Sequence, residues 1–284
     1  MDLRGGRESR NVEDRRGQGR GVGGRAGIGL GGILLALVAM YFGIDPSVVL
    51  DGAQLAQPPA SSTPAPRPAA ENELARFSSM VLADTEDTWG ELFAAGGQRY
   101  QQPVLVLYTG STSSACGVGQ AQMGPFYCPA DRKLYLDLSF FDELRQRFRA
   151  PGEFAQAYVI AHEVGHHVQN LLGISGQVQQ RRQRLPEREG NQLSVRLELQ
   201  ADCFAGVWAH HADRSRQILE TGDVEAALRA ASAIGDDRIQ QQSQGRVVPD
   251  SFTHGSAEQR MRWFRRGLEQ GRLDQCDTFA VAQP

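Results

Sequence analysis

The histidines His162 and His166, with Glu163 directly after the first, limit what this chain of 284 residues can fold into more than any other feature. Residues four apart in an α-helix lie one turn apart on the same face, so both imidazoles can reach one metal ion while Glu163 flanks them. The neighbouring stretches 154–161 and 168–172 contain no charge and no proline, as a buried helix requires. The motif therefore predicts a buried, metal-binding helix.

A catalytic zinc ion takes three protein ligands and keeps a fourth position for water, so a third ligand must come from elsewhere in the chain. Glu198 and Asp202 are also one helical turn apart, in a stretch that is apolar nearly all round, so their carboxylates would be buried and in need of a cation. We predict that His162, His166 and Glu198 bind one zinc ion and that Asp202 accepts the second ring N–H of one histidine. The alternative is an exposed acidic face.

The other residues near these motifs have simpler interpretations. Gly165 weakens a helix by roughly 1 kcal/mol relative to alanine, which indicates a close approach of another backbone or of the metal site. His167 points about 100° away from the metal face, so we predict that it is packed or hydrogen-bonded. His210 and His211 follow Glu198 by at least twelve residues and are too far along the same predicted helix to share its ion.

The pairing of the histidine motif with a downstream E-x-x-x-D resembles the gluzincins, the thermolysin-like branch of the zinc peptidases. His254 lies in a loop that is similar to the histidine-containing loop of membrane-associated gluzincins, whose histidine stabilises the oxyanion, although Gly255 stands where many of them have proline. Ser256 is a plausible N-cap for a helix over 257–268. We predict that His254 is catalytic, with a purely structural role as the alternative.

The chain as a whole resembles the neutral zinc metallopeptidases of bacteria. The matching segments are the arginine-rich opening 1–16, an apolar N-terminal segment, GPFYCP at 124–129, LYLD at 134–137, HEVGHHVQ at 162–169, ELQADCFAG at 198–206 and THGSAEQR at 253–260. The resemblance implies a zinc-dependent peptidase with one catalytic Zn²⁺, and it does not specify a natural substrate.

Composition divides the chain into four parts. Residues 1–25 are rich in glycine and carry seven arginines against four acidic residues, so we expect a disordered tail. Residues 26–44 are nineteen uncharged, largely apolar residues, long enough for a transmembrane anchor. Residues 45–70 are rich in proline and alanine and predict an extended linker. Residues 71–284 remain as the zinc metallopeptidase domain.

The arginines before residue 26 predict a single-pass membrane protein with a cytoplasmic N-terminus and a periplasmic or extracellular catalytic domain. A cleaved signal peptide is the alternative, but the apolar run is long for one. Export to an oxidising compartment fits the even number of cysteines. We expect Cys116 to pair with Cys128 and Cys203 with Cys276; reduced thiols are the alternative.

The fold class predicted is α+β: a zincin-like domain, mostly helical with a small sheet, preceded by one transmembrane helix. We expect a helix over 71–93, strands over 103–109 and 133–139, and helices from there to the C-terminus. Residues 134–138 are our candidate for an edge strand along which substrate lies, although an interior strand fits the same pattern.

These features predict a membrane-anchored peptidase in which Glu163 acts as general base on a zinc-activated water. The partners expected are a peptide or protein substrate and the membrane. Two alternatives stay open, a non-proteolytic zinc-binding scaffold protein and an amide hydrolase that acts on cell-wall peptides. The net charge of −3 and the lack of a basic aromatic patch give no reason to expect nucleic-acid binding.

Overall fold

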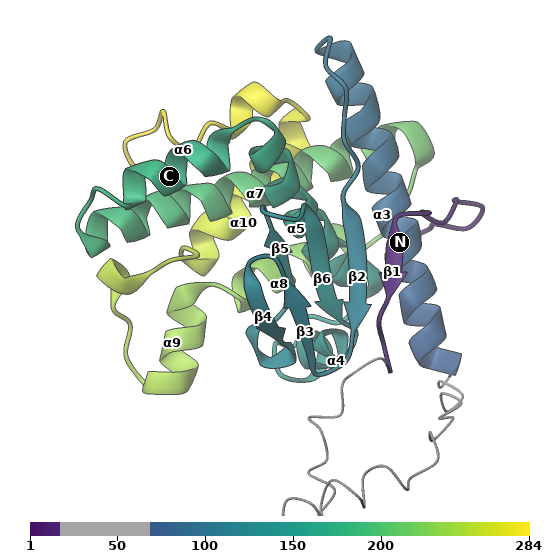
Figure 1. The fold of residues 1–284 in the computed structure, drawn as a ribbon, viewed down its shortest axis with the longest axis horizontal. Coiled ribbons are helices and arrows are strands. Elements are labelled where there is room, and N and C mark those ends of the chain that lie inside the picture. Colours follow the sequence, from purple (N-terminus) through teal and green to yellow (C-terminus); the bar gives the residue numbers. More distant parts are fainter. Residues whose placement is uncertain (18–68) are drawn as a thin grey trace, which may run out of the picture. The chain divides into compact units, whose positions relative to one another are not determined.

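The structure, a computed structural model, describes residues 1–17 and 69–284. Met1–Arg16 and the residues after the undescribed segment belong to one compact unit (Figure 1). In chain order its elements are β1 (Val12–Asp14), α3 (Ala69–Ala95), β2 (Val104–Tyr108), β3 (Ser111–Ser114), β4 (Gly117–Gln120), η1 (Ala121–Met123), β5 (Phe126–Cys128), β6 (Lys133–Asp137), α4 (Ser139–Gln146), α5 (Glu153–Leu171), α6 (Ile174–Arg182), α7 (Glu187–Arg216), α8 (Asp223–Ala233), α9 (Asp236–Gln244), η2 (Pro249–Ser251), α10 (Ala257–Gln270) and η3 (Leu273–Cys276).

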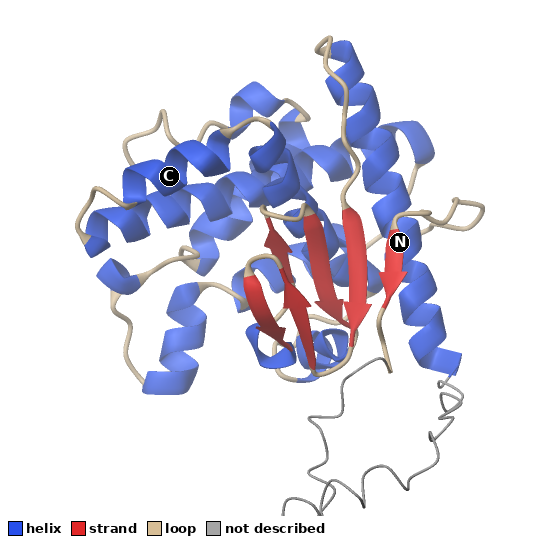
Figure 2. Cartoon of the chain, in the orientation of Figure 1, coloured by secondary structure: helices blue, strands red, loops and turns tan. Residues whose placement is uncertain are grey.

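The main sheet has four strands in the order β1-β2-β6-β5, and β3 and β4 form a separate hairpin (Figure 2). β1, β2 and β6 are parallel, whereas β5 runs antiparallel to β6. Leu105 and Leu107 of β2 enter the large core shared with the helices, and Val106 and Tyr108 enter a small cluster on the opposite face. Both faces of the central strands are therefore buried, which is why β2 carries no charge and β6 has charged residues only at its two ends, Lys133 and Asp137.

α5 lies at the centre of the helical part of this fold. It packs against α7, α8 and α3, and it also contacts β5 and β6. All but a few of its residues are buried, as the uncharged stretches on both sides of the histidine motif predict. The structure is thus a mixed α/β fold, mostly helical with small sheets, as expected.

The predicted helix over 71–93 and the strands over 103–109 and 133–139 are confirmed as α3, β2 and β6. The candidate edge strand over 134–138 is wrong, because β6 is an interior strand between β2 and β5. The edge next to α5 is β5, a strand of only three residues that follows Pro125. So short a segment carries too little periodicity to be recognised from sequence.

The predicted disorder of residues 1–25 is wrong for residues 1–16. Val12–Asp14 extend the sheet by parallel pairing with β2. Carboxylates hold arginines of this segment: Arg7 pairs with Glu86 and Asp87 of α3, and Arg16 is nearly buried against Asp14 and Glu71. Composition misleads here because part of the compensating charge, on Glu71, Glu86 and Asp87, lies 55 to 80 residues further along the chain.

This strand pairing also bears on the predicted topology. The anchor predicted at 26–44 and nearly all of the linker predicted at 45–70 lie outside the described residues. A single membrane crossing at 26–44 would nevertheless place residues 1–16 and the rest of the unit on opposite sides, and they could not then share a sheet. None of the helices in residues 1–17 and 69–284 combines the length and the hydrophobicity that a membrane span needs.

Candidate metal centre

The two helices that carry the predicted ligands cross at Gly165. A Cβ atom added there would lie 2.9 Å from the carbonyl oxygen of Ala201 on α7, closer than real Cβ contacts come. The glycine inside α5 therefore permits the close approach of a second backbone, as its presence in a buried helix predicted. The crossing places the face of α5 with His162 and His166 against the face of α7 with Glu198.

His162, His166 and Glu198 converge as a group of possible metal ligands, with one atom of each within 4.8 Å of the others. Nε2 of His162 is 3.1 Å from one oxygen of Glu198, and Nε2 of His166 is 3.4 Å from the other. Each histidine thus directs the same ring nitrogen toward the carboxylate. Two imidazoles and one carboxylate form a set of donors that suits zinc and leaves room for a further ligand.

The second ring nitrogen of each histidine contacts an acceptor. Nδ1 of His162 is 2.8 Å from Oδ1 of Asp202, and Nδ1 of His166 is 2.9 Å from the side-chain oxygen of Gln169. Gln169 is itself fixed, since its amide donates to the carbonyl of Leu197 on α7. These contacts favour the proton on Nδ1 and leave Nε2 of both histidines to bind a metal, the arrangement expected of a zinc site.

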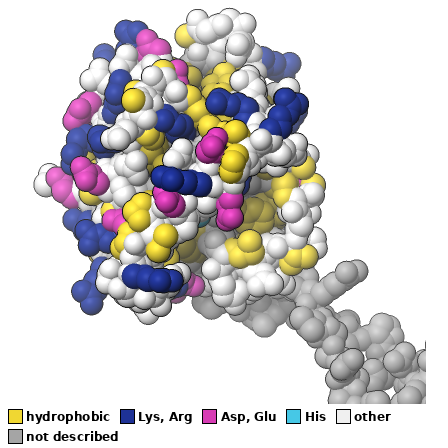
Figure 3. All heavy atoms as spheres, turned by 90° about the vertical axis from the view of Figure 1, so that its left-hand side faces the viewer, with side chains coloured by type: hydrophobic (Ala, Val, Ile, Leu, Met, Phe, Trp, Pro, Cys, Tyr) yellow, Lys and Arg dark blue, Asp and Glu magenta, His cyan; other side chains and the backbone are white. Residues whose placement is uncertain are grey.

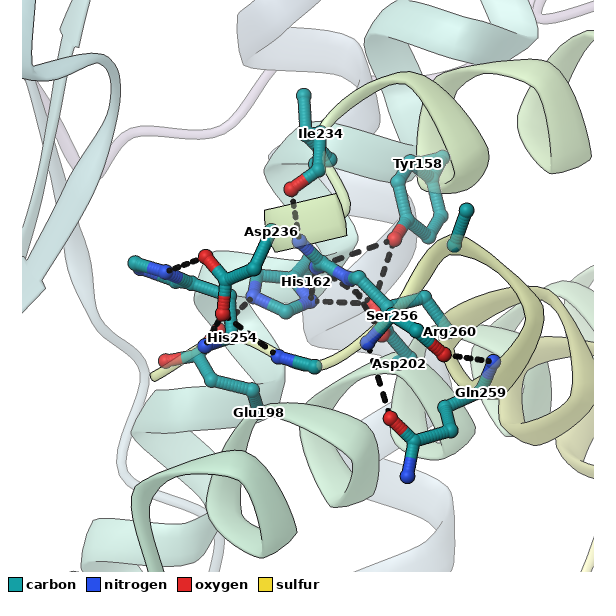
Figure 4. A network of polar contacts seen from close by, with 12 residues as sticks. Tyr158, His162, Glu198, Asp202, Ile234, Asp236, His254, Ser256, Gln259 and Arg260 are labelled. Atoms are coloured by element: carbon teal, nitrogen blue, oxygen red, sulfur yellow. Dashed lines mark hydrogen bonds and ion pairs between the residues drawn. The ribbon is translucent and has the colours of Figure 1, made fainter. Parts of the chain in front are cut away.

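Asp202 stands at the centre of a fully buried polar network (Figure 4). Besides contacting His162, it accepts hydrogen bonds from the hydroxyl of Tyr158 and from Arg260 of α10, whose Nε and Nη2 lie 2.8 and 2.9 Å from its two oxygens. Burial would raise the pKa of Asp202, but Arg260 and His162 lower it to about 2. Asp202 is therefore an ionised, rigidly held acceptor behind His162.

Mutual contact also sets the protonation of the cluster. Burial opposes a charged imidazole, yet Asp202 and Glu198 outweigh it and raise the pKa of His162 to about 10. Burial likewise opposes the charge of Glu198, while His166 and His162 hold its pKa well below the ordinary value. Because a metal binds the neutral imidazole, a cation here would take the place of these protons.

Glu163 lies beside the cluster and lines the same cleft, which has a volume of about 790 Å³. Its side chain is buried, and burial raises its pKa above the ordinary value for glutamate. A carboxylate with a raised pKa can both accept and return a proton near neutral pH, as a general base requires.

His254 lines this cleft too, from the loop between η2 and α10. The loop is organised by Asp236, the first residue of α9. One oxygen of Asp236 accepts from the backbone N–H groups of Thr253, His254 and Gly255, and the other is 3.2 Å from Nδ1 of His254. The His254 side chain is half-exposed, and the hydrogen bond to Asp236 raises its pKa.

The backbone at Gly255 explains the departure from the gluzincin pattern. Its φ of +91° lies in the region that favours glycine, and proline, fixed near −65°, could not adopt it. Ser256 begins α10 with a capping box in which Gln259 takes part, so the predicted N-cap is confirmed. The cap, Asp236 and Gly255 together hold the His254 loop over the cleft.

The remaining histidines lie outside the centre. His167 is fully buried between the hydroxyl of Tyr127 and the carbonyl of Gln101, and burial lowers its pKa to about 4. His210 and His211 contact the carbonyl groups of Leu268 and Gly271. The packed or hydrogen-bonded role predicted for His167 is confirmed.

Both expected disulfides are formed. Cys116 bonds to Cys128, which ties the β3–β4 hairpin to β5, and Cys203 bonds to Cys276, which ties α7 to η3. The second bridge lies one residue after Asp202 and fixes the C-terminal segment against the helix that carries Glu198. All four cysteines are thus structural, and none is a metal ligand.

Three residues of the centre were missed by sequence reasoning. Arg260 and Tyr158 hold Asp202, and Asp236 holds the His254 loop. Arg260 offered one usable signal: it falls on the same face of its predicted helix as apolar residues, and a buried arginine needs a carboxylate. The sequence does not show which carboxylate.

Together the fold and the centre define a class of protein. A mostly helical α/β unit brings two histidines from an HExxH helix and a glutamate from a second helix into one cleft, with the motif glutamate beside them, as in the HExxH metal hydrolases.

The chain belongs to the family described as "Putative neutral zinc metallopeptidase", whose model matches residues 1–279. It is 54% identical to the uncharacterised protein YpfJ of Escherichia coli K12 over 287 residues, which covers 98% of this chain and 99% of that protein. It is 47% identical over 193 residues, 64% of each chain, to the uncharacterised protein Rv2575 of Mycobacterium tuberculosis H37Rv. No solved structure matches the chain. The family expected from the motifs is therefore confirmed.

Proposed function

We propose that the protein is a zinc-dependent peptidase in which His162, His166 and Glu198 hold one zinc ion. The observation that carries the proposal is the convergence of these three side chains beside Glu163 in a single cleft. The donor set fits the metal, because both histidines face Glu198 through Nε2 while acceptors occupy Nδ1.

Zinc, when bound, supplies a Lewis acid that polarises the scissile carbonyl and acidifies a water molecule. The Glu163 carboxylate accepts the proton of the attacking water and returns it to the leaving amine. His254, oriented through Nδ1 by Asp236, stabilises the negative charge that develops on the carbonyl oxygen. Asp202, charged and held by Arg260, keeps His162 in the tautomer that can bind metal.

The edge strand β5 supports binding of an extended peptide. β5 is the last strand of the sheet on the side of α5, and Phe126 and Tyr127 of this strand line the cleft. A peptide can add to such an edge through backbone hydrogen bonds, which hold it extended across the catalytic residues.

The scaffold alternative is less well supported. A purely structural zinc usually has four protein ligands and needs no general base. In the described part of the chain, the group that can hold a metal consists of three residues, and Glu163 stands beside it. An amide hydrolase acting on wall peptides would use the same chemistry and differs only in substrate.

For the compartment, we propose that residues 1–16 and the rest of the unit lie together on one oxidising side of the membrane. The two disulfides and the pairing of β1 with β2 support this arrangement. Any membrane attachment through residues 26–44 must then have both of its ends on that side. This proposal replaces the single crossing with a cytoplasmic N-terminus.

The ligand assignment is tested by metal analysis of the full-length protein, because residues 1–16 are part of the folded unit. Glu198→Ala should lose most of the zinc. The control is Glu189→Ala, which removes an exposed carboxylate from the same helix and should leave one zinc per chain. Equal zinc content in the two variants would contradict the assignment.

A further inference from the structure

Exposed large hydrophobic side chains gather in two segments of the described chain. Val118 and Met123 lie in β4 and in the short helix η1 that follows it, and Ile239, Val247 and Val248 lie in α9 and in the turn after it. Other large hydrophobic side chains of the described residues are less exposed. Clustered exposure of this kind marks binding surfaces, whereas single scattered side chains do not.

Both segments border the catalytic cleft. Met123 is 69% exposed and Ile239 is 36% exposed, and both line the cleft that contains Glu163. Further apolar residues lining it are Phe140, Phe148, Val159 and Ile234. Figure 3 shows the side of the molecule on which α9 lies, with hydrophobic side chains around a hollow. A ligand in this cleft therefore meets apolar side chains on its way to the catalytic residues.

The charges of the cleft do not suit an acidic ligand. Three glutamates line it, Glu143, Glu163 and Glu198, against two arginines. Arg260 is buried and bound to Asp202, and the exposed Arg147 is 3.7 Å from Glu143. The acidic side chains of the lining therefore outnumber the basic ones, which disfavours a ligand with several carboxylates. Among the described residues, no lysine lines the cleft.

From these observations we propose that the cleft selects extended segments of unfolded proteins that carry large apolar side chains, and that Met123 and Ile239 determine this specificity by contacting those side chains. The inference rests on the proposed peptidase function and names its substrate class. Folded proteins keep such side chains in their cores, so the substrates are chains that have lost, or not yet reached, their native structure. Wall peptides, with their exposed carboxylates, are poor ligands by the same reasoning.

The test measures binding rather than turnover. Full-length, zinc-loaded Glu163→Gln protein is titrated against two fluorescent peptides of equal length, and anisotropy is recorded. One peptide carries Phe and Leu around its central bond and the other Ser and Glu. We expect the apolar peptide to bind roughly tenfold more tightly, since two apolar side chains leave water.

The double substitution Met123→Gln with Ile239→Gln should remove most of that preference and leave binding of the polar peptide unchanged. Val248→Gln, an exposed site of the same segment that does not line the cleft, is the matched control and should change neither affinity. Equal affinity for the two peptides in the unsubstituted cleft, or equal loss of both in the double variant, would overturn the inference. If the double variant proves less stable, the comparison of the two peptides on the Glu163→Gln protein with Met123 and Ile239 intact still tests the preference for apolar side chains.

The two proposals can fail separately. If the apolar peptide binds preferentially but the unsubstituted protein does not cleave it, the peptidase function is contradicted and the proposed specificity stands. Cleavage of both peptides at the same rate and with the same KM would contradict the specificity and keep the peptidase function.

Discussion

Replacement of Arg260 by methionine should be among the most destabilising single changes in the unit. Asp202 is fully buried, and within the described residues its cationic partners are His162 and the buried Arg260. Removing one partner of a buried ion pair leaves an uncompensated charge, which costs about 3–5 kcal/mol. Lowering the pKa of Asp202 from 3.8 to about 2 by itself corresponds to about 2 kcal/mol, so a loss of about 3 kcal/mol is expected.

The pH dependence of this loss has a definite sign. Asp202 has a lower pKa in the folded protein than in the unfolded chain, so its stabilising contribution is complete above pH 3.8 and disappears as the pH falls toward 2. Urea unfolding of the full-length protein at pH 7 should therefore show the full difference between Arg260→Met and the unsubstituted protein. That difference should shrink below pH 3.

The control for this experiment is Arg145→Met, which breaks an exposed ion pair with Asp142 and should leave the unfolding midpoint unchanged. Because Asp202 orients His162, Arg260→Met should also weaken zinc binding by roughly 10–100-fold. Unfolding of Arg260→Met and Arg145→Met at the same urea concentration would show that Arg260 does not stabilise Asp202 in this way.

Three further predictions concern other parts of the unit. Asp236→Asn should lower the raised pKa of His254. Activity that needs protonated His254 is lost as the pH rises through that pKa, so the alkaline limb of the pH profile should move to lower pH. An alkaline limb that does not move would exclude this role for His254. Breaking the Cys203–Cys276 bridge, which spans 73 residues, should cost about 4 kcal/mol by the chain-entropy estimate, and an unchanged unfolding midpoint would contradict that figure. A cysteine introduced among residues 1–16 and a cysteine introduced at an exposed position after residue 69 should both react, or both fail to react, with a membrane-impermeant thiol reagent in intact cells. Labelling of only one of the two would show that the strand pairing does not form in the cell.

The parts of this protein that follow from sequence are those fixed by spacing along one element. The distance of four residues between His162 and His166 sets their common helical face, and the same spacing presents Glu198 and Asp202 together. Gly165 likewise predicted the close crossing with α7, because a glycine weakens a buried helix and is tolerated where another backbone approaches closely.

The parts that could not be predicted depend on contacts between elements far apart in the chain. Arg260 meets Asp202 across 58 residues and Asp236 meets His254 across 18, and no local pattern specifies either pair. The arginine-rich opening became a strand because β2 offered an edge and α3 offered carboxylates, neither of which its own composition reveals. Burial and pairing overrode a compositional signal that, taken alone, indicates disorder.

If Glu163 is the general base of a zinc peptidase, its replacement by glutamine should separate metal binding from catalysis. Zinc content and peptide cleavage rate are measured on the same sample of full-length Glu163→Gln protein. Glutamine keeps the size of the side chain and cannot accept the proton of water, so we expect close to one zinc per chain and a cleavage rate lower by at least about a hundredfold. A variant that keeps its zinc and cleaves peptide as fast as the unsubstituted protein would contradict the proposed mechanism.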